Sequence, residues 1–295
     1  MRAAAIFGPG CSPQDLYQFQ ASSESDWSIG LPGESSEADA IIIFGGDGTV
    51  HRHLPQLAKL RLPVLVVPSG SGNDFARALR LPSIRDSLSA WRKFSSDGDN
   101  VRDIDLGLIT PVADKNLPGE SPAPNGRLFC CVGGIGLDAE ISRRANLLPR
   151  WLRAHGGYVL SLLPALLKFA PLKASISLSR DEAFIPAPFT RIMVAVFANT
   201  PTYGGGMKMA PRAQFDDGIL DVCVVQNMNK VKLFCLFPTI YFGRHLRIPQ
   251  VEYFQTERLR IETDHPTDVY ADGEYVCHTP IEVSVARKAL PVIVP

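Results

Sequence analysis

Residues 41–50 read Ile41-Ile42-Ile43-Phe44-Gly45-Gly46-Asp47-Gly48-Thr49-Val50, an apolar run followed by a glycine-rich turn. The apolar run is mostly β-branched, which predicts a buried strand. Glycine permits a sharp turn and a close approach to a ligand. A helical pattern begins near Thr49, so unpaired amides should face outward where the helix starts, an arrangement that binds phosphate. We predict a phosphate-binding turn; the alternative is an ordinary strand-to-helix turn.

A second stretch repeats this pattern roughly twenty residues later. Residues 62–68, LPVLVVP, predict another buried strand, and residues 69–77, SGSGNDFAR, predict a second glycine-rich turn. Asn73 or Asp74 is expected to cap the helix that follows. Two such units suit adjacent parallel strands with a helix between them. Their carboxyl ends would then share one crevice, the place where open α/β sheets bind ligands.

Length, composition and charge limit the size and the partners that we expect for this protein. The chain has 295 residues, 45% of them hydrophobic, which is enough for one large domain or two. Its 30 basic and 30 acidic residues cancel, so nothing indicates a general attraction to nucleic acid or to an anionic membrane. No apolar stretch reaches the roughly 18 residues that span a bilayer. We expect a cytoplasmic protein without a transmembrane segment, whose membrane contact is local, apolar and transient.

The pattern changes after a polar loop at residues 95–100. Before it, strands alternate with helical stretches; after it, short strands follow one another, which predicts an α/β domain and then a β-sandwich. We place the first domain at 1–98 together with the tail at about 287–295, and the second at 99–286. The expected strands lie at 2–7, 17–22, 101–108, 127–132, 172–179, 190–198, 219–226, 257–263, 267–271, 281–286 and 290–294, and a long hairpin loop at 111–126.

Three helices are expected outside the two turns, at 84–94, 138–146 and 156–169. The first is amphipathic, and the second follows a glycine-rich turn at 133–138. The third is apolar nearly all round, which favours a buried helix. The alternative for this third helix is the wall of a lipid channel, or a surface patch that dips into a membrane.

The two turns together resemble the diacylglycerol kinase catalytic family, which includes bacterial lipid kinases and sphingosine kinases. The sequence GGDGT alone is shared with NAD kinases, and the second motif, PSGSGNDFAR, favours the lipid kinases over the NAD kinases. The segments that agree later in the chain are 105–107, 134–139, 203–208, 216–221 and 271–274. The resemblance implies an NAD-kinase-like Rossmann-type α/β domain with a C-terminal β-sandwich domain. It also implies an ATP- and Mg²⁺-dependent kinase that phosphorylates the hydroxyl of diacylglycerol or a related lipid at the membrane surface.

Phosphoryl transfer needs the phosphates to be held, their charge neutralised and the hydroxyl deprotonated. The two turns are assigned to the nucleotide. The nucleotide-binding set is Gly8, Gly45, Gly46, Asp47, Gly48, Thr49, Val50, His51, Arg52, Gly70, Ser71, Gly72 and Asn73. Asp47 is the only carboxylate in the first turn, so we assign it to the Mg²⁺ or phosphate site. A cap on the helix that begins near Thr49 is the alternative role for Asp47.

The remaining assignments come from the second half of the chain. The turn Asp272-Gly273-Glu274 is the candidate catalytic turn, with Glu274 as general base and Asp272 beside it; a plain β-turn is the alternative. The resemblance implies a structural Mg²⁺ held by the Asp217 carboxylate and by Gln214 and Ile219 through their carbonyls. By the same resemblance, Asp138, Gly205 and Lys208 border the acceptor site.

The sequence departs from the family pattern at three positions. Gly8 stands where relatives have asparagine, Arg52 where glutamate is usual, and Cys131 where asparagine is frequent. These departures leave open a catalytically inactive nucleotide- or lipid-binding member of the family. A sphingoid-base or ceramide-type kinase is also open. An NAD kinase shares GGDGT, but the sequence has no second motif of the kind that NAD kinases use for NAD. The oligomeric state is open as well, a homodimer included.

Overall fold

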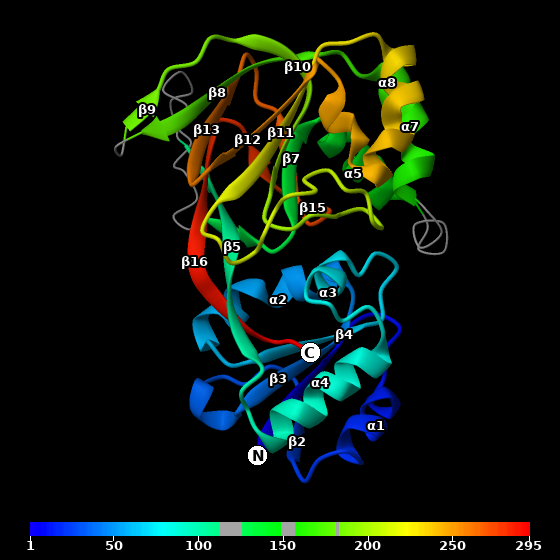
Figure 1. Cartoon of the computed structure of the whole chain (residues 1–295), viewed down its shortest axis with the longest axis vertical. Coiled ribbons are helices and arrows are strands. Elements are labelled where there is room, and N and C mark those ends of the chain that lie inside the picture. The colour runs from blue at the N-terminus through cyan, green and yellow to red at the C-terminus, as the bar shows by residue number, and fades with distance from the viewer. Residues whose placement is uncertain (113–125, 149–156, 181–182) are drawn as a thin grey trace. The chain divides into compact units, whose positions relative to one another are not determined.

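The computed structural model describes residues 1–112, 126–148, 157–180 and 183–295 (Figure 1). The chain divides into two compact units, Met1–Leu106 with Arg287–Pro295, and Gly107–Ala286. Two strands, β5 (Val101–Pro111) and β16 (Ile281–Ile293), each run from one unit into the other. Unit 1 therefore extends beyond residue 98, the limit expected from the sequence. Most of the hairpin loop predicted at 111–126 lies outside the described residues.

Unit 1 is built on a parallel sheet in the order β16–β4–β3–β1–β2. Its strands are β1 (Arg2–Phe7), β2 (Asp26–Ile29), β3 (Ala40–Gly45) and β4 (Val64–Pro68), together with the end of β16. Ile41 lies opposite Val64 and Gly45 opposite Pro68, so β3 and β4 end side by side. This pairing confirms the adjacent parallel strands predicted from the two apolar runs.

Helices cover both faces of this sheet. Figure 1 shows α2 (Asp47–Leu60) on one side of the strands, with α1 (Tyr17–Gln20) and α4 (Ile84–Ser96) on the other. Helix α4 begins at its Ser83 cap and packs on β4, where the Ser87 hydroxyl donates to the carbonyl of Val66 at 2.9 Å. The remaining short elements are η1 (Pro13–Leu16), η2 (Ser35–Glu37) and α3 (Asp74–Ala78).

The strand predicted at 17–22 is wrong, because this segment is the short helix α1 preceded by η1. Leu16 and Phe19 are buried while Tyr17 is exposed. That spacing of three places the two apolar side chains on one helical face, whereas a strand would alternate them with a period of two. Strand β2 was not anticipated, because its residues are mostly exposed and therefore show no clear apolar pattern.

Unit 2 is mainly antiparallel, in the order β15–β14–β7–β10–β8–β13–β16. Strands β11 and β12 extend from β10, β5 and β6 pair beside β16, and β9 pairs with β8. Strands from these different branches share one hydrophobic core. The strands are β6 (Arg127–Phe129), β7 (Val132–Gly136), β8 (Leu172–Arg180), β9 (Ala183–Ile185), β10 (Thr190–Ala198), β11 (Leu220–Gln226), β12 (Val251–Thr256), β13 (Arg258–Thr263), β14 (Asp268–Ala271) and β15 (Glu274–His278).

Two predictions for unit 2 and the end of the chain need correction, one of a turn and one of a strand. The glycine-rich segment predicted as a turn is strand β7, and only Gly136, with φ +84°, makes the turn into the next helix. Glycine suits β7 because a Cβ at Gly133 would lie 2.2 Å from the ring of Phe197. The end of the chain is one continuous strand, β16, rather than two. Strands β9, β12 and β15 were not anticipated.

Helices α5 (Leu137–Leu147), α7 (Gly157–Lys168) and α8 (Lys230–Leu236) gather on one side of the unit 2 strands in Figure 1. Two 3-10 helices, η3 (Phe237–Phe242) and η4 (Arg244–Arg247), follow α8. Helix α7 is not buried all round: Leu162 and Leu166 are buried, whereas Leu163 and Leu167 are exposed. Within the described residues, no helix is both long and apolar enough to cross a bilayer.

A glycine under an aromatic ring gives a test of the unit 2 core. Gly107 on β5 lies opposite Phe129 on β6, and a Cβ at Gly107 would lie 1.9 Å from the ring of Phe129. Phe129 is itself fully buried against Phe197, so the ring has no free space to enter. Gly107→Ala should lower the free energy of unfolding by about 1–3 kcal/mol, the usual cost of overpacking.

Urea unfolding followed by tryptophan fluorescence and circular dichroism would measure this loss. Gly33→Ala is the matched control, since a Cβ there would meet only the end of the Glu37 side chain at 3.4 Å. An unfolding midpoint for Gly107→Ala equal to that of Gly33→Ala would show that the ring does not pack as described.

Candidate functional site

The two glycine-rich turns of unit 1 touch through their main chains. A Cβ built at Gly46 would lie 2.8 Å from the Cα of Gly70, and one at Gly70 would lie 2.5 Å from the Cα of Gly46. No side chain fits in this contact, so both positions require glycine. The amide of Ser69 also donates to the carbonyl of Gly45 at 3.1 Å. The structure therefore brings the two predicted turns side by side.

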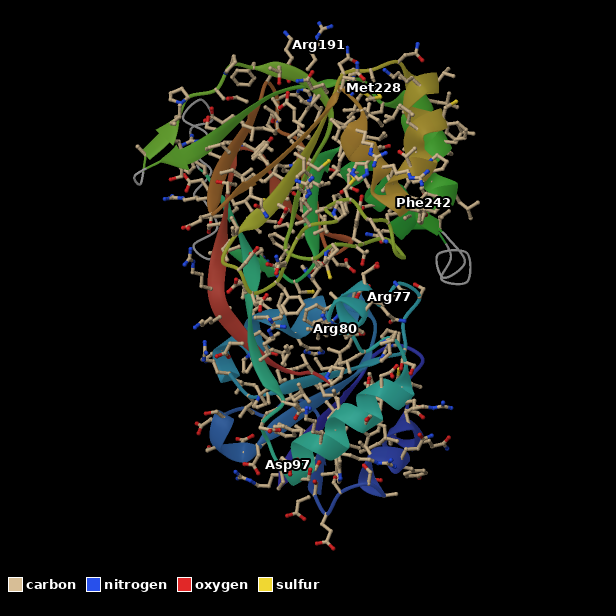
Figure 2. The ribbon with its side chains drawn as sticks, in the orientation of Figure 1. Arg77, Arg80, Asp97, Arg191, Met228 and Phe242 are labelled. Atoms are coloured by element: carbon tan, nitrogen blue, oxygen red, sulfur yellow. The ribbon has the colours of Figure 1, made fainter. Side chains whose placement is uncertain are left out.

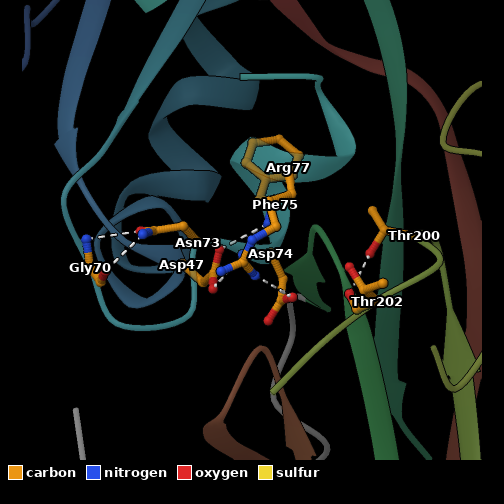
Figure 3. Close-up of polar contacts among 8 residues, drawn as sticks. All are labelled: Asp47, Gly70, Asn73, Asp74, Phe75, Arg77, Thr200 and Thr202. Atoms are coloured by element: carbon orange, nitrogen blue, oxygen red, sulfur yellow. Dashed lines mark hydrogen bonds and ion pairs between the residues drawn. The ribbon is translucent and has the colours of Figure 1, made fainter. Parts of the chain in front are cut away.

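Asp47 binds the second turn to the first (Figure 3). Its Oδ2 accepts from the amide of Asp74 and its Oδ1 from the amide of Phe75, both at 3.0 Å. The carboxylate thus caps α3, a helix that begins 27 residues later in the chain. Asn73 closes the second turn, since its Oδ1 accepts from the amide of Gly70 and its Nδ2 donates to the carbonyl of the same residue.

The joined turns present main-chain amides and cations. Among the described residues, the amides of Gly48, Ser71 and Gly72 donate to no acceptor. Gly48 and Ser71 are exposed, as are the side chains of Arg52 and Arg77. Arg77, which Figure 2 labels, also pairs with the buried Asp74 carboxylate at 3.1 Å. Unpaired amides at a helix start, with cations nearby, suit an anionic group such as a phosphate.

Some residues of the predicted nucleotide-binding set make contacts inside unit 1. The Thr49 side chain is buried where a Cβ at Gly8 or at Gly45 would meet its Oγ1, at 2.3 and 2.6 Å respectively. The Thr49 and Val50 amides both donate to the carbonyl of Gly46, and the Gly8 amide donates to the carbonyl of Phe44. These residues therefore shape the turn. In this chain a Cβ at Gly8 would collide with the Thr49 side chain, so the local packing accepts only glycine at this position.

In unit 2, residues 272 and 273 form a tight hairpin between β14 and β15. Asp272 has φ +49° and Gly273 has φ +84°, and the flanking residues Ala271 and Glu274 are paired. Positive φ at both central residues is what a type I′ turn requires, which is why Asp-Gly is favoured there. Glu274 is exposed, and within the described part of the chain nothing is hydrogen-bonded to its carboxylate. Its position suits a group that must receive a proton.

The Asp272 carboxylate is instead held by main-chain amides. It accepts from Cys130 at 2.8 Å, from Cys131 at 2.8 Å and from Val132 at 3.2 Å. These bonds fix the hairpin to the start of β7, so Asp272 positions Glu274. The Cys131 side chain is buried and its contribution to this contact is made by the main chain. The departure at Cys131 therefore leaves the support of the hairpin intact.

An apolar pocket lies in the helical part of unit 2. Its walls come from α5, α7, β10, β11, α8, η3 and the segment 203–209. Every lining residue is apolar except Asp138 and Tyr203. Asp138 is buried and accepts a hydrogen bond from the Tyr203 hydroxyl. A pocket that is apolar except at one buried polar pair suits a long hydrocarbon chain with a single polar group.

The loop after Tyr203 borders this pocket. Gly204, Gly205 and Gly206 all have positive φ, and a pair of hydrogen bonds between Tyr203 and Met207 closes the loop. The segment leading into it is fixed by the Thr200 hydroxyl, which donates to the carbonyl of Thr202 at 3.2 Å (Figure 3). The predicted substrate residues differ in placement. Asp138 lines the pocket, whereas Gly205 and Lys208 are exposed and do not.

The predicted metal segment is an exposed turn before β11. The Asp217 Oδ1 accepts from the Ile219 amide at 3.1 Å, and Gln214 and Asp217 are both exposed. Asp221, the second residue of β11, is buried and accepts a hydrogen bond from the Tyr253 hydroxyl at 2.6 Å. Burial raises the pKa of Asp221, and the Tyr253 and Gln255 hydrogen bonds partly offset this rise. The donor set of this turn is entirely oxygen, which fits Mg²⁺.

Sequence reasoning missed three features that the structure assembles. They are the role of Asp47 as a cap for a distant helix, the Tyr203 partner of Asp138, and Asn146, whose Nδ2 donates to the carbonyl of Gly273 at 2.7 Å. Each contact joins segments far apart in the chain, so no local pattern points to it. The tyrosine directly before three glycines was the one available signal.

The Asp47 contact can be tested by removing its carboxylate. Asp47→Ala leaves the partly buried amides of Asp74 and Phe75 without their acceptors. We expect a loss of about 1–3 kcal/mol in the free energy of unfolding, together with faster hydrogen exchange at those two amides. Asp97→Ala, at an exposed position labelled in Figure 2, is the control and should change stability by less than about 0.5 kcal/mol. Unchanged exchange at Asp74 and Phe75 would contradict the cap.

Two family models match successive parts of the chain. Residues 30–109 match the family model of the diacylglycerol kinase catalytic domain, and residues 132–294 match that of the YegS C-terminal NAD kinase beta sandwich-like domain. The chain is 33% identical over 257 residues to a diacylglycerol kinase of Mycobacterium tuberculosis, covering 87% of this chain and 77% of that protein. It is 26% identical to a diacylglycerol kinase of Bacillus subtilis, covering 88% and 78% respectively.

Solved structures share the fold. A putative diacylglycerol kinase from Bacillus anthracis superposes with a TM-score of 0.72 at 21% identity, covering 100% of this chain and 97% of that one. An NAD kinase from Archaeoglobus fulgidus, solved in complex with ATP, gives a TM-score of 0.52 at 13% identity, covering 100% and 93%. The predicted fold class, an NAD-kinase-like α/β domain with a β-sandwich domain, is therefore confirmed. The chain belongs to the diacylglycerol kinase family and is a lipid kinase, a phosphotransferase.

Proposed function

We propose that this lipid kinase transfers the γ-phosphate of ATP to the hydroxyl of diacylglycerol at the membrane surface. The observation that carries the choice of lipid is the unit 2 pocket, which is apolar except for Asp138 and Tyr203. A diacyl lipid has hydrocarbon chains for such walls and hydroxyl and ester groups for the polar pair. Phosphate-binding turns and a hydrocarbon pocket on one chain are what this reaction needs.

The nucleotide is assigned to the paired turns of unit 1. The exposed amides of Gly48 and Ser71 would donate to phosphate oxygens, and Arg52 and Arg77 would balance their charge. On this proposal Arg52 is a phosphate contact, so the departure at this position does not imply loss of activity. Asp47 acts mainly by holding the two turns together, because both of its oxygens accept amides.

The chemical step forms a bond between the lipid hydroxyl oxygen and the γ-phosphorus and breaks the bond from that phosphorus to the bridging oxygen of ADP. Glu274 receives the hydroxyl proton, and Asp272 holds the turn that presents Glu274. Mg²⁺ would screen the phosphate charge when bound. A structural Mg²⁺ is assigned to Gln214, Asp217 and Ile219, which are suited by their oxygen donors.

A sphingoid-base kinase is the second candidate. The observation that favours it is the buried Asp138 carboxylate in the pocket, which could pair with the amine of a sphingoid base as well as with a hydroxyl. Diacylglycerol carries no amine, so the two lipids make different demands on Asp138. A panel containing both lipids therefore separates the candidates.

The first test supplies purified protein with ATP labelled at the γ-phosphate, Mg²⁺ and a panel of lipids in mixed micelles. We expect label in diacylglycerol, with less in sphingosine and ceramide and none in NAD. Preferential labelling of sphingosine would move the assignment to the second candidate. Binding of ATP without transfer to any lipid would contradict both candidates and indicate a nucleotide-binding protein without kinase activity.

The second test concerns Glu274. Glu274→Gln keeps the size of the side chain but removes the proton acceptor, so kcat should fall by roughly 10²–10⁴-fold. Because Glu274 is exposed, stability should stay unchanged. Glu252→Gln, the same change at an exposed position on β12, should keep the wild-type rate. A Glu274→Gln enzyme with wild-type kcat would exclude Glu274 as the base.

A further inference from the structure

Helix α7 has apolar residues on two opposite faces. Leu162 and Leu166 are only 4% and 2% exposed and line the pocket. Leu160, Leu163 and Leu167 are 51%, 47% and 66% exposed. Their spacing of three and four places these three leucines in one stripe along the helix. The exposed face of a helix normally carries polar residues, so this apolar stripe indicates a binding surface.

The apolar surface continues onto α8 and η3, where Val231, Phe234 and Phe242 are 70%, 46% and 71% exposed. Helices α7 and α8 lie side by side in Figure 1, and Figure 2 labels Phe242. The Lys230 ammonium donates to the carbonyl of Leu167 at 2.9 Å, which joins the end of α7 to the start of α8. We call this surface the α7–α8 face: Leu160, Leu163, Leu167, Val231, Phe234 and Phe242.

Cations lie on the helices that form the α7–α8 face and on η4, which follows them in the chain. Lys168 at the end of α7, Lys232 on α8, and Arg244 and Arg247 on η4 are all exposed. The sequence has no aspartate or glutamate between Asp221 and Glu252, and none within α7. Positive charge is therefore concentrated here although the whole chain is neutral. On neighbouring α5, Glu140 is neutralised by ion pairs with Arg143 and Arg144.

We propose that the α7–α8 face docks this protein on an anionic lipid bilayer. The inference rests on the proposed function only in that the bilayer contains the substrate. The leucine stripe and Phe242 enter the boundary between headgroups and acyl chains, while Lys168 and Lys232 stay among the anionic headgroups. Phe234 belongs to the face and also lines the pocket, so the docked surface adjoins the pocket.

Charge decides between a bilayer and the other partners of an exposed apolar surface. A second copy of the chain would bring the same cations against one another, and like charges facing each other are unfavourable. An anionic membrane satisfies both the leucines and the cations at once. The concentration of cations around the stripe therefore favours a lipid surface over self-association.

Vesicle co-sedimentation tests the proposal without ATP or turnover. The wild-type protein should bind vesicles that contain equal amounts of phosphatidylglycerol and phosphatidylcholine at least tenfold more tightly than vesicles of phosphatidylcholine alone. Raising the salt to about 0.5 M should weaken this binding, because the Debye length falls to a few Å. Equal binding to both vesicles, or no binding to either, would overturn the proposal.

Two double variants locate the surface. Leu163→Asp with Leu167→Asp, and Lys168→Glu with Lys232→Glu, should each weaken binding to the anionic vesicles more than tenfold, since each basic residue contributes roughly fivefold. The apolar control is Ile185→Asp, at a residue 50% exposed on β9. The charge control is Lys173→Glu with Arg191→Glu, a cross-strand pair on β8 and β10 with the same change in net charge. Wild-type binding by both test variants would overturn the proposal.

Two further measurements separate the possible failures. In mixed micelles, the leucine variant should still phosphorylate a short-chain lipid, because Leu163 and Leu167 do not line the pocket. Vesicle binding without kinase activity in the wild type would contradict the proposed function and leave docking supported. Sedimentation equilibrium of the free protein should give the same mass for wild type and leucine variant. If the substitutions instead convert a dimer into a monomer, the face is a subunit interface and the proposal is overturned.

Discussion

The contact between the Gly46 and Gly70 backbones is the constraint on which the rest of unit 1 depends. The two turns approach so closely that a single added carbon on either would collide with the other. Asp47 then bonds across the contact to the amides of Asp74 and Phe75. The neighbouring exposed amides of Gly48 and Ser71 donate to no acceptor in the described part of the chain, and on our proposal they bind the nucleotide phosphates. A polar surface is thus formed without any long side chain having to be ordered.

In unit 2, helix α5 fixes two parts of the candidate site relative to each other. The first turn of this helix places Asp138 in the apolar pocket, where Tyr203 donates to it, and its last turn holds Gly273 through Asn146. Asp272 fixes the other side of the same hairpin to the start of β7. One rigid helix therefore links the position of the pocket to that of Glu274. This coupling fits a reaction in which a lipid and a proton acceptor must be held in register.

In unit 2, helix α7 has two apolar faces in different environments. The inner face of α7 lines the pocket and its outer face leaves leucines exposed. The cations nearby have no acidic neighbours along the sequence from 222 to 251, so their field is not cancelled locally. Net charge near zero therefore says little about this surface. The distribution of charge, which follows from the packing of α7 against α8, is what matters for a lipid partner.

The sequence by itself determined the family, the parallel pair β3–β4, the two glycine turns and most strands of unit 2, because these depend on local apolar runs and on turn residues. The predictions of a strand at α1 and of a turn at β7 were wrong, because a short polar helix and a glycine-rich strand lack the apolar patterns that identify helices and strands. Tertiary structure alone decided that Asp47 caps α3, that Thr49 fills the space beside Gly8, and that α7 is buried on one face only. Those outcomes depend on contacts between distant segments, and no local spacing encodes them.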